Sequence, residues 1–209
     1  MVLSVAFDTG GAGAAGPWIR AANPAYPCLI DEKHVVAELY DMVNVPSAVW
    51  INEEGRIVRP MEPAGVGDEF RTMDHATYRM PEEALAELRR KRTLYMDALR
   101  DWVAKGEASV HALSPEEARR RLRGPSDEQA LASANFRLAV YLYQRGHRED
   151  AQKYLADSTR LRPESWNFRR QSWWLEEPAK AGGPEFWAAV DGLGRQRYYP
   201  RIEMEGMPE

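Results

Sequence analysis

Short apolar runs separated by polar turns predict alternating strands and helices in the first part of the chain. The runs at 2–7 and 26–30 are short and apolar, and each is followed by an aspartate, as expected for buried strands. A Gly/Ala-rich loop to Gly16 and a short helix at 17–23 are predicted between them. Residues 32–42 then show a helical period with one apolar face. This pattern predicts the order strand, helix, strand, helix.

A β-hairpin and a long helix are predicted next. Residues 47–51 form an apolar run, 52–55 read Asn-Glu-Glu-Gly, and 56–59 read Arg-Ile-Val-Arg, a second short segment that can return as the antiparallel partner. An acidic turn that ends in glycine between two such runs is typical of an antiparallel hairpin. A helical pattern follows Pro81 and ends near Gly106. Residues 1–105 therefore predict an α/β domain with flanking helices.

The sequence pattern of residues 106–209 predicts helices and no strands. Ser114 and Ser126 each begin a capping sequence with Glu or Gln three residues later. The expected helices span 115–123, 126–146 and 148–161, and a tryptophan-rich tail follows Pro163. We therefore place the boundary between an α/β domain and an all-α region near residues 105 and 106.

Charge and composition exclude several classes of function. The net charge is −4, with 12 basic residues against 16 acidic ones up to Lys105 and 16 against 16 beyond it. Neither half has the basic excess of a nucleic-acid-binding protein. No run approaches 18 apolar residues, and the N-terminus lacks a signal-peptide pattern. We therefore expect a cytoplasmic protein with no nucleic-acid partner and no membrane segment.

The segment around Pro46 carries a family resemblance. Val45-Pro46, the apolar strand at 47–51, the acidic-Gly turn and Arg56-Ile57-Val58 resemble the second half of thioredoxin-like proteins, closest to the TlpA/ResA type of redoxin. The resemblance implies a mixed sheet with flanking helices and a cis Val45–Pro46 bond. It also implies that Val45 and Pro46 contact a protein or peptide disulfide substrate, with the backbone of Val45 available for strand addition.

The chain does not carry the cysteine pair that the resemblance implies. Thiol–disulfide exchange needs an attacking thiolate and a resolving thiol, and Cys28 is the only cysteine. In the family, the pair lies in the helix after the central strand, upstream of the segment matching 2–8. That central strand would lie between the strands at 2–7 and 48–51, and it is also missing from this chain. The resemblance thus implies an incomplete thioredoxin-like fold, with unpaired sheet edges that would be costly.

Several expectations follow from the missing motif. We expect Met1 to be internal to a longer, bacterial protein, whose active-site motif contains cysteine or selenocysteine. Cys28 is a candidate thiol on the inserted strand, although its apolar neighbours favour an inert, half-buried side chain. The complete protein would exchange a disulfide or reduce a peroxide.

The helical region matches the spacing of one tetratricopeptide repeat. The matching positions are Leu138, Ala139, Leu142, Gly146, Ala151, Leu155, Ser158 and Pro163. A single repeat cannot bury its own apolar face, so it must pack on the helix at 115–123 or on the tail. We expect Leu138, Leu142 and Leu155 to be buried with Trp166 and Trp173. Either a module for a protein partner or a helical appendage fits this pattern.

A glycine-rich sequence offers a competing interpretation. Gly11–Gly16 match G-x-G-x-x-G after a strand, and Asp31 lies 20 residues after Gly11, as in dinucleotide-binding domains. However, Asp8-Thr9-Gly10 separates the strand from the first glycine, and Pro17 and Pro24 restrict the helix. The simpler interpretation is a flexible Ala/Gly loop.

The remaining polar residues suggest no cofactor or metal site. His34, His75, His111 and His147 are scattered without the spacing of metal ligands and are expected on the surface. The basic run at 89–92 has acidic residues one turn away, which favours a solvated helix face.

The sequence therefore leaves two functions open. The first is a thioredoxin-like redox protein that is inactive without an upstream motif. The second is a non-catalytic interaction protein built from a degenerate redoxin fold and one helical repeat.

Overall fold

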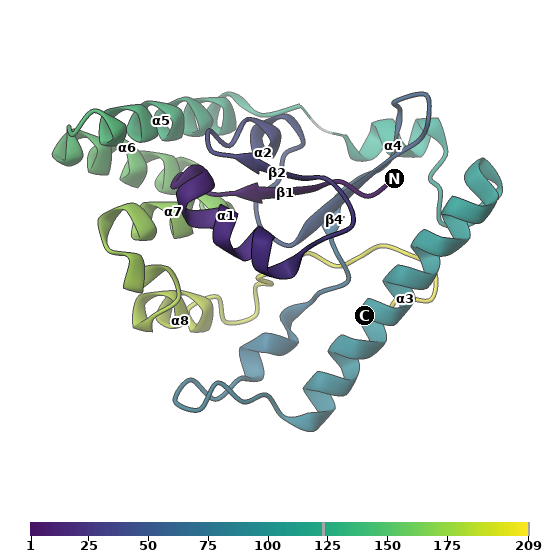
Figure 1. Ribbon diagram of the computed structural model, residues 1–209. Helices are drawn as coiled ribbons and strands as arrows, with labels where there is room; N and C mark the ends of the chain where they lie inside the picture. The colour runs from purple at the N-terminus through teal and green to yellow at the C-terminus, as the bar shows by residue number, and fades with distance from the viewer. Residues whose placement is uncertain (123, 209) are drawn as a thin grey trace. The chain divides into compact units, whose positions relative to one another are not determined.

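A computed structural model describes residues 1–122 and 124–208 and shows a mixed α/β protein (Figure 1). The chain divides into two compact units, each made of two separate segments. The first unit consists of Met1–Val43 and Pro125–Gly182, and the second of Asn44–Gly124 and Gly183–Glu209. The boundary expected near residues 105 and 106 lies inside the second unit. Both units therefore combine strands from the first half of the chain with helices from the second.

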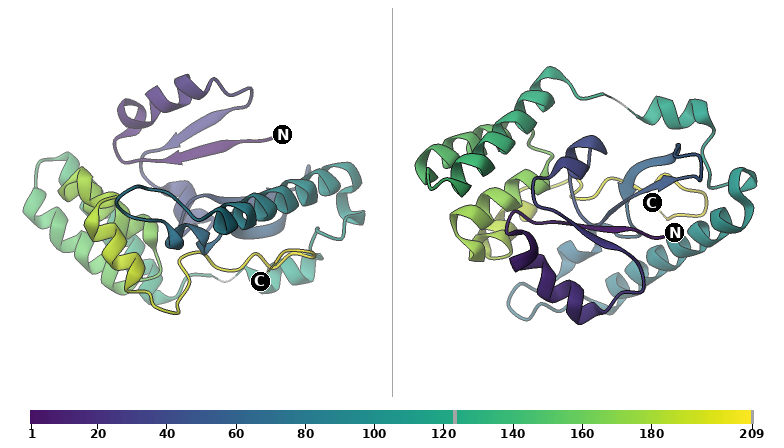
Figure 2. Two further views of the ribbon diagram at one scale, coloured as in Figure 1. Left: turned by 90° about the horizontal axis from the view of Figure 1, so that it is seen from below. Right: turned by 45° about the horizontal axis from the view of Figure 1, so that its top comes forward.

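The first unit begins with a parallel β–α–β arrangement. Strand β1 (Ser4–Phe7) pairs in parallel with β2 (Cys28–Asp31), and helix α1 (Gly11–Ala22) connects them and runs alongside the pair (Figure 2). The short helix α2 (Val35–Leu39) follows β2. The order agrees with the sequence prediction, except that α1 begins at Gly11 and includes the expected Gly/Ala loop. Ala15 and Gly16 are buried, so packing of this small-residue face stabilises the helix despite its glycines.

The strands form two separate sheets, which corrects the expectation of one mixed sheet. Strand β3 (Ser47–Ile51) pairs antiparallel with β4 (Ile57–Pro63), around the predicted turn at 52–55. Within the residues that the structure describes, β1 pairs only with β2 and β3 only with β4. The expected mixed sheet needs a central strand, and the described residues form no strand other than these four.

Helices α5 (Asp127–Gln144) and α6 (Arg148–Leu161) form an antiparallel pair in the first unit. Ser126 caps α5 as predicted: its hydroxyl accepts from the Gln129 N–H, and the Gln129 side chain accepts from the Ser126 N–H. Helix α7 (Trp166–Glu176) packs against α6. The tryptophan-rich segment thus covers the helical pair, one of the two alternatives left open by the sequence.

The core of this helical part contains Ala139 and Leu155 from the predicted repeat positions, but neither Leu138 nor Leu142. Its buried residues are Ala132, Phe136, Ala139, Val140, Leu155, Phe168 and Leu175. Leu155 is fully buried and Trp166 is 3% exposed, as expected, whereas Leu142 and Trp173 are only half-buried. Leu138 is 39% exposed, so its predicted burial is wrong. Phe136 takes the central place, stacked on Phe168 with 4.5 Å between ring centroids.

Polar contacts join the two segments of the first unit. The backbone N–H of Asn167 donates to the Val43 carbonyl at 3.0 Å, and its side chain donates to the Met42 carbonyl. The buried Arg162 forms an ion pair with Asp41. The end of the β–α–β segment is therefore fixed to the start of α7 by hydrogen bonds as well as by apolar packing.

The second unit combines the hairpin with α3 (Glu82–Lys105), α4 (Pro115–Arg121) and α8 (Pro184–Asp191). A 3-10 helix at Asp68–Thr72 lies in the stretch between β4 and α3. The chain after α8 contributes Ile202 and Met204 to the core of this unit. Further core residues are Trp50, Val58, Tyr95 and Ala98. The C-terminal segment is therefore an integral part of the second unit.

A buried ion pair lies within that core. Arg59 is 2% exposed, and its Nε and Nη2 donate to the two carboxylate oxygens of Glu62 at 2.9 and 2.8 Å. The same guanidinium donates to the carbonyls of His111 and Glu203. Four donor contacts from one side chain thus join the hairpin, the segment before α4 and the C-terminal segment.

Candidate functional site

The Val45–Pro46 segment precedes β3, and its peptide bond is cis, as predicted. Both residues are exposed, with 37% of the Val45 surface accessible. Asn44 is 3% exposed, and its side-chain amide donates to the Tyr198 carbonyl at 3.2 Å. A buried asparagine therefore fixes the backbone immediately before the two exposed residues.

The backbone of this segment is occupied within the second unit. The Val45 N–H donates to the Asn44 Oδ1 at 2.9 Å, and the Tyr199 hydroxyl donates to the Val45 carbonyl at 2.7 Å. The Pro46 carbonyl accepts from the Ala64 N–H at 3.1 Å. The availability of the Val45 backbone for strand addition, expected from the sequence, is thus not seen, and a pairing strand would have to displace Tyr199. Nothing in the sequence indicated this contact, because it joins residues 154 positions apart.

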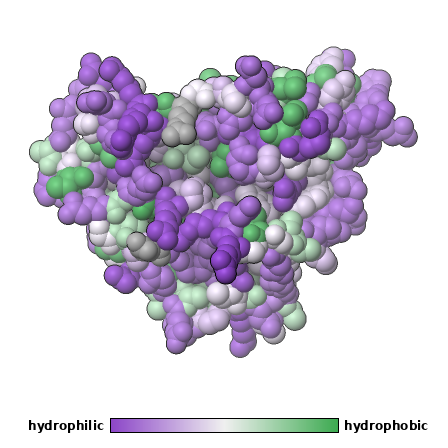
Figure 3. Space-filling model, turned by 180° about the vertical axis from the view of Figure 1, so that it is seen from behind, coloured by the Kyte–Doolittle hydropathy of each residue, from purple (hydrophilic) through white to green (hydrophobic). Residues whose placement is uncertain are grey.

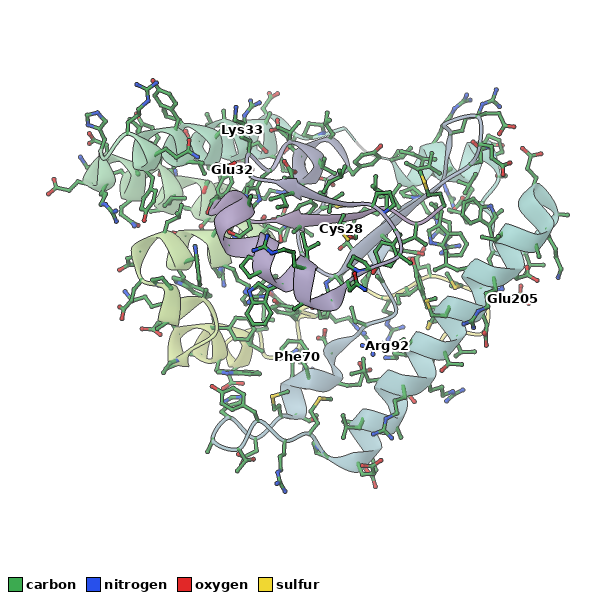
Figure 4. All side chains as sticks on the ribbon, in the orientation of Figure 1. Cys28, Glu32, Lys33, Phe70, Arg92 and Glu205 are labelled. Atoms are coloured by element: carbon green, nitrogen blue, oxygen red, sulfur yellow. The ribbon has the colours of Figure 1, made fainter. Side chains whose placement is uncertain are left out.

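Cys28 is the first residue of β2 and is half-buried (Figure 4). The Ser4 hydroxyl lies 2.9 Å from its Sγ, across the parallel pair. Because the sequence contains no second cysteine, this thiol has no resolving partner in the chain.

The glycine-rich sequence is helical and not a phosphate-binding loop between a strand and a helix. Gly11–Gly16 form the first part of α1, and Gly11 has a φ of +59°. The acidic residue that would bind a ribose is engaged elsewhere. The Asp31 carboxylate accepts from the backbone N–H groups of Val35, Val36 and Ala37 at 2.9, 2.7 and 3.2 Å. Asp31 therefore stabilises the N-terminal end of α2, and we do not propose a dinucleotide site here.

Replacing Asp31 with alanine is expected to lower the free energy of unfolding of the first unit by about 1–2 kcal/mol, the usual cost of removing a helix cap. Asp31→Asn keeps one side-chain acceptor oxygen and should lose less. Lys33→Ala is a nearby exposed control that should change stability little. Urea denaturation followed by tryptophan fluorescence measures all three variants. Equal losses for the alanine and asparagine variants would contradict the capping role.

Among the histidines, His34 is buried and the prediction that it lies on the surface is wrong. It is 3% exposed, and its ring lies 5.0 Å from that of Phe136 and 6.1 Å from that of Phe7. Neither ring nitrogen has a hydrogen-bond partner. Burial lowers the pKa of His34 to about 4, although the charges of Asp31 and Asp8 oppose this shift.

In residues 1–122 and 124–208, no group of three His, Cys, Asp or Glu side chains is arranged to hold a metal ion. None of the helices described is both long and apolar enough to cross a bilayer. On the face shown in Figure 3, hydrophobic residues are scattered among hydrophilic ones.

Comparison with known proteins gives no relative for this chain: no protein-family model, no curated protein and no solved structure matches it.

Proposed function

We propose that the chain is the later part of a thioredoxin-like redox protein of the TlpA/ResA type, followed by a tetratricopeptide-like helical region. The observation that carries the proposal is the pair of small sheets. Strand β1 is paired on one side with a parallel strand, β3 on one side with an antiparallel strand, and Pro46 lies immediately before β3. An absent central strand would account for both unpaired edges.

In this proposal, Val45 and Pro46 contact a disulfide-bearing peptide, and the chemistry is performed by a cysteine or selenocysteine motif upstream of residue 1. The exposed Val45 and Pro46 side chains support a contact role. Cys28 takes no part, because the sequence contains no second cysteine that could act as its resolving thiol.

The chain 1–209 is expected to show no reduction of insulin disulfides with dithiothreitol as the electron donor, because a single cysteine cannot cycle between dithiol and disulfide. Turbidity from precipitating insulin chains measures the rate, with a Cys28→Ser variant as the matched control. A rate above the uncatalysed background that persists in Cys28→Ser would contradict the proposal.

The upstream coding sequence provides the positive test. Reading the genome before the codon for Met1 should reveal an in-frame cysteine codon, separated by two codons from a second cysteine codon or a selenocysteine codon. The protein extended to include that motif should reduce insulin. A stop codon in frame with no such motif would reject the proposal.

A non-catalytic interaction protein is the second candidate. It is favoured by the hydrogen bond between the Tyr199 hydroxyl and the Val45 carbonyl, because this bond occupies a backbone group that substrate pairing would need. Inactivity of the extended protein, together with binding of a partner at the helical region, would support this alternative.

A further inference from the structure

A shallow groove runs between α6 and α7 in the first unit. Its volume is about 430 Å³, and it is open to solvent. It is lined by Ala156, Thr159, Arg160, Pro163, Arg169, Ser172 and Trp173. The α6 residues lie three and four positions apart, as do the α7 residues, so each set projects from one face of its helix.

Arg169 is the most informative residue in this groove. It is half-buried, its guanidinium carbon lies 4.9 Å from the centroid of the Trp166 ring, and its Nη2 donates to the Pro163 carbonyl at 3.4 Å. Within the described part of the chain, no carboxylate forms an ion pair with it. Desolvation lowers the pKa of Arg169, and no neighbouring acid offsets that effect. A partly desolvated cation without an anion is a favourable site for a carboxylate.

The other residues define the type of anion. Arg160 adds a second guanidinium, and its bond to Asp157 at 3.0 Å joins two exposed side chains, so an incoming carboxylate can displace it at little cost. The half-buried Trp173 offers an apolar surface for an aliphatic or aromatic side chain. The groove contains only two arginines, and the chain as a whole has a net charge of −4. The groove is therefore a poor match for a polyanion such as a nucleic acid.

We propose that the α6–α7 groove binds an acidic peptide segment of a partner protein. One carboxylate of the peptide pairs with Arg169, a second with Arg160, and an apolar side chain packs on Trp173. The site is independent of the proposed redox function, because every residue in it belongs to the helical part of the first unit.

The test is fluorescence anisotropy with a fluorescein-labelled peptide of Asp, Glu and Leu residues and the full chain at low salt. Arg169→Gln should weaken binding by about tenfold, as expected for loss of a charge-assisted pair, and Arg160→Gln by less because its side chain is exposed. Arg100→Gln, an exposed residue on α3, changes the net charge equally and should bind like the wild type.

A second comparison does not depend on the folding of any variant. A peptide with Asn and Gln in place of Asp and Glu should not bind the wild-type chain, and added salt should weaken binding of the acidic peptide. The proposal is overturned if the acidic peptide does not bind, if the amide peptide binds equally, or if Arg100→Gln weakens binding as much as Arg169→Gln. If a phosphopeptide bound about tenfold more tightly than the acidic peptide, the ligand of the groove would be a phosphate and not a carboxylate, and the proposal would be overturned.

Discussion

Replacing Arg59 with methionine is expected to destabilise the second unit by about 3–5 kcal/mol, the usual cost of breaking one side of a buried ion pair. Methionine fills a similar volume but leaves the Glu62 carboxylate, whose side chain is 10% exposed, without the two guanidinium donors of Arg59. The carbonyls of His111 and Glu203 lose a donor as well. The large effect thus comes from the groups left unpaired as well as from the lost attraction.

Guanidinium chloride denaturation monitored by tryptophan fluorescence measures this loss, because Trp50 and Trp102 stack within the same core. Arg56→Met, at an exposed position of the hairpin, is the matched control and should change stability by less than about 0.5 kcal/mol. The double variant Arg59→Met, Glu62→Leu should be more stable than Arg59→Met alone, since it removes the unpaired charge. If the double variant were the less stable of the two, the buried charge would not be the cause.

The order of the elements could be predicted because each depends on local signals. The aspartates after the apolar runs, the Asn-Glu-Glu-Gly turn and the Ser126 capping box are read within a few residues, and the corresponding elements are present. The start of α1 was not predictable in the same way. Three glycines disfavour a helix locally, and only the burial of Ala15 and Gly16 makes the helix favourable.

The buried charged residues could not be predicted from the sequence. Lys91 lies in a basic run that was expected to be solvated, yet it is 7% exposed and paired with Glu69. Glu69 lies 22 positions away, as His111 lies 52 positions from Arg59. A charged residue is buried only when such distant partners surround it, and sequence spacing does not reveal which partners meet.

The same limit applies to the candidate site. The sequence identified Val45 and Pro46 through a resemblance to a family, and the cis bond predicted between them is present. It did not indicate that Tyr199 binds the Val45 carbonyl or that Asp68 accepts from the backbone N–H groups of Tyr198 and Tyr199. The C-terminal segment carries no motif, and its position depends on packing against residues more than a hundred positions earlier.

Acidification is expected to destabilise the first unit through His34. The pKa of this buried side chain is lowered to about 4, whereas the unfolded chain has the ordinary value of 6.5. Between these values the unfolded chain binds a proton that the folded chain excludes. The first unit therefore has its full stability with respect to His34 above pH 6.5, and it loses that stability as the pH falls toward 4. The full difference corresponds to about 3 kcal/mol.

The His34→Asn variant tests this expectation, because asparagine does not titrate in this range and tolerates the left-handed backbone at φ 55°. Unfolding free energies measured from pH 7 down to about 4 should fall less steeply for this variant than for the wild type. His147→Asn, at an exposed position, should follow the wild-type curve. The neighbouring carboxylates of Asp31 and Asp8 are present in both proteins, so the difference between the curves isolates the imidazole. Parallel curves for His34→Asn and the wild type would contradict the expectation. They would mean that the ring takes up a proton while it stays between Phe7 and Phe136. Water or a carboxylate would then have to reach a ring nitrogen that has no partner in the folded structure.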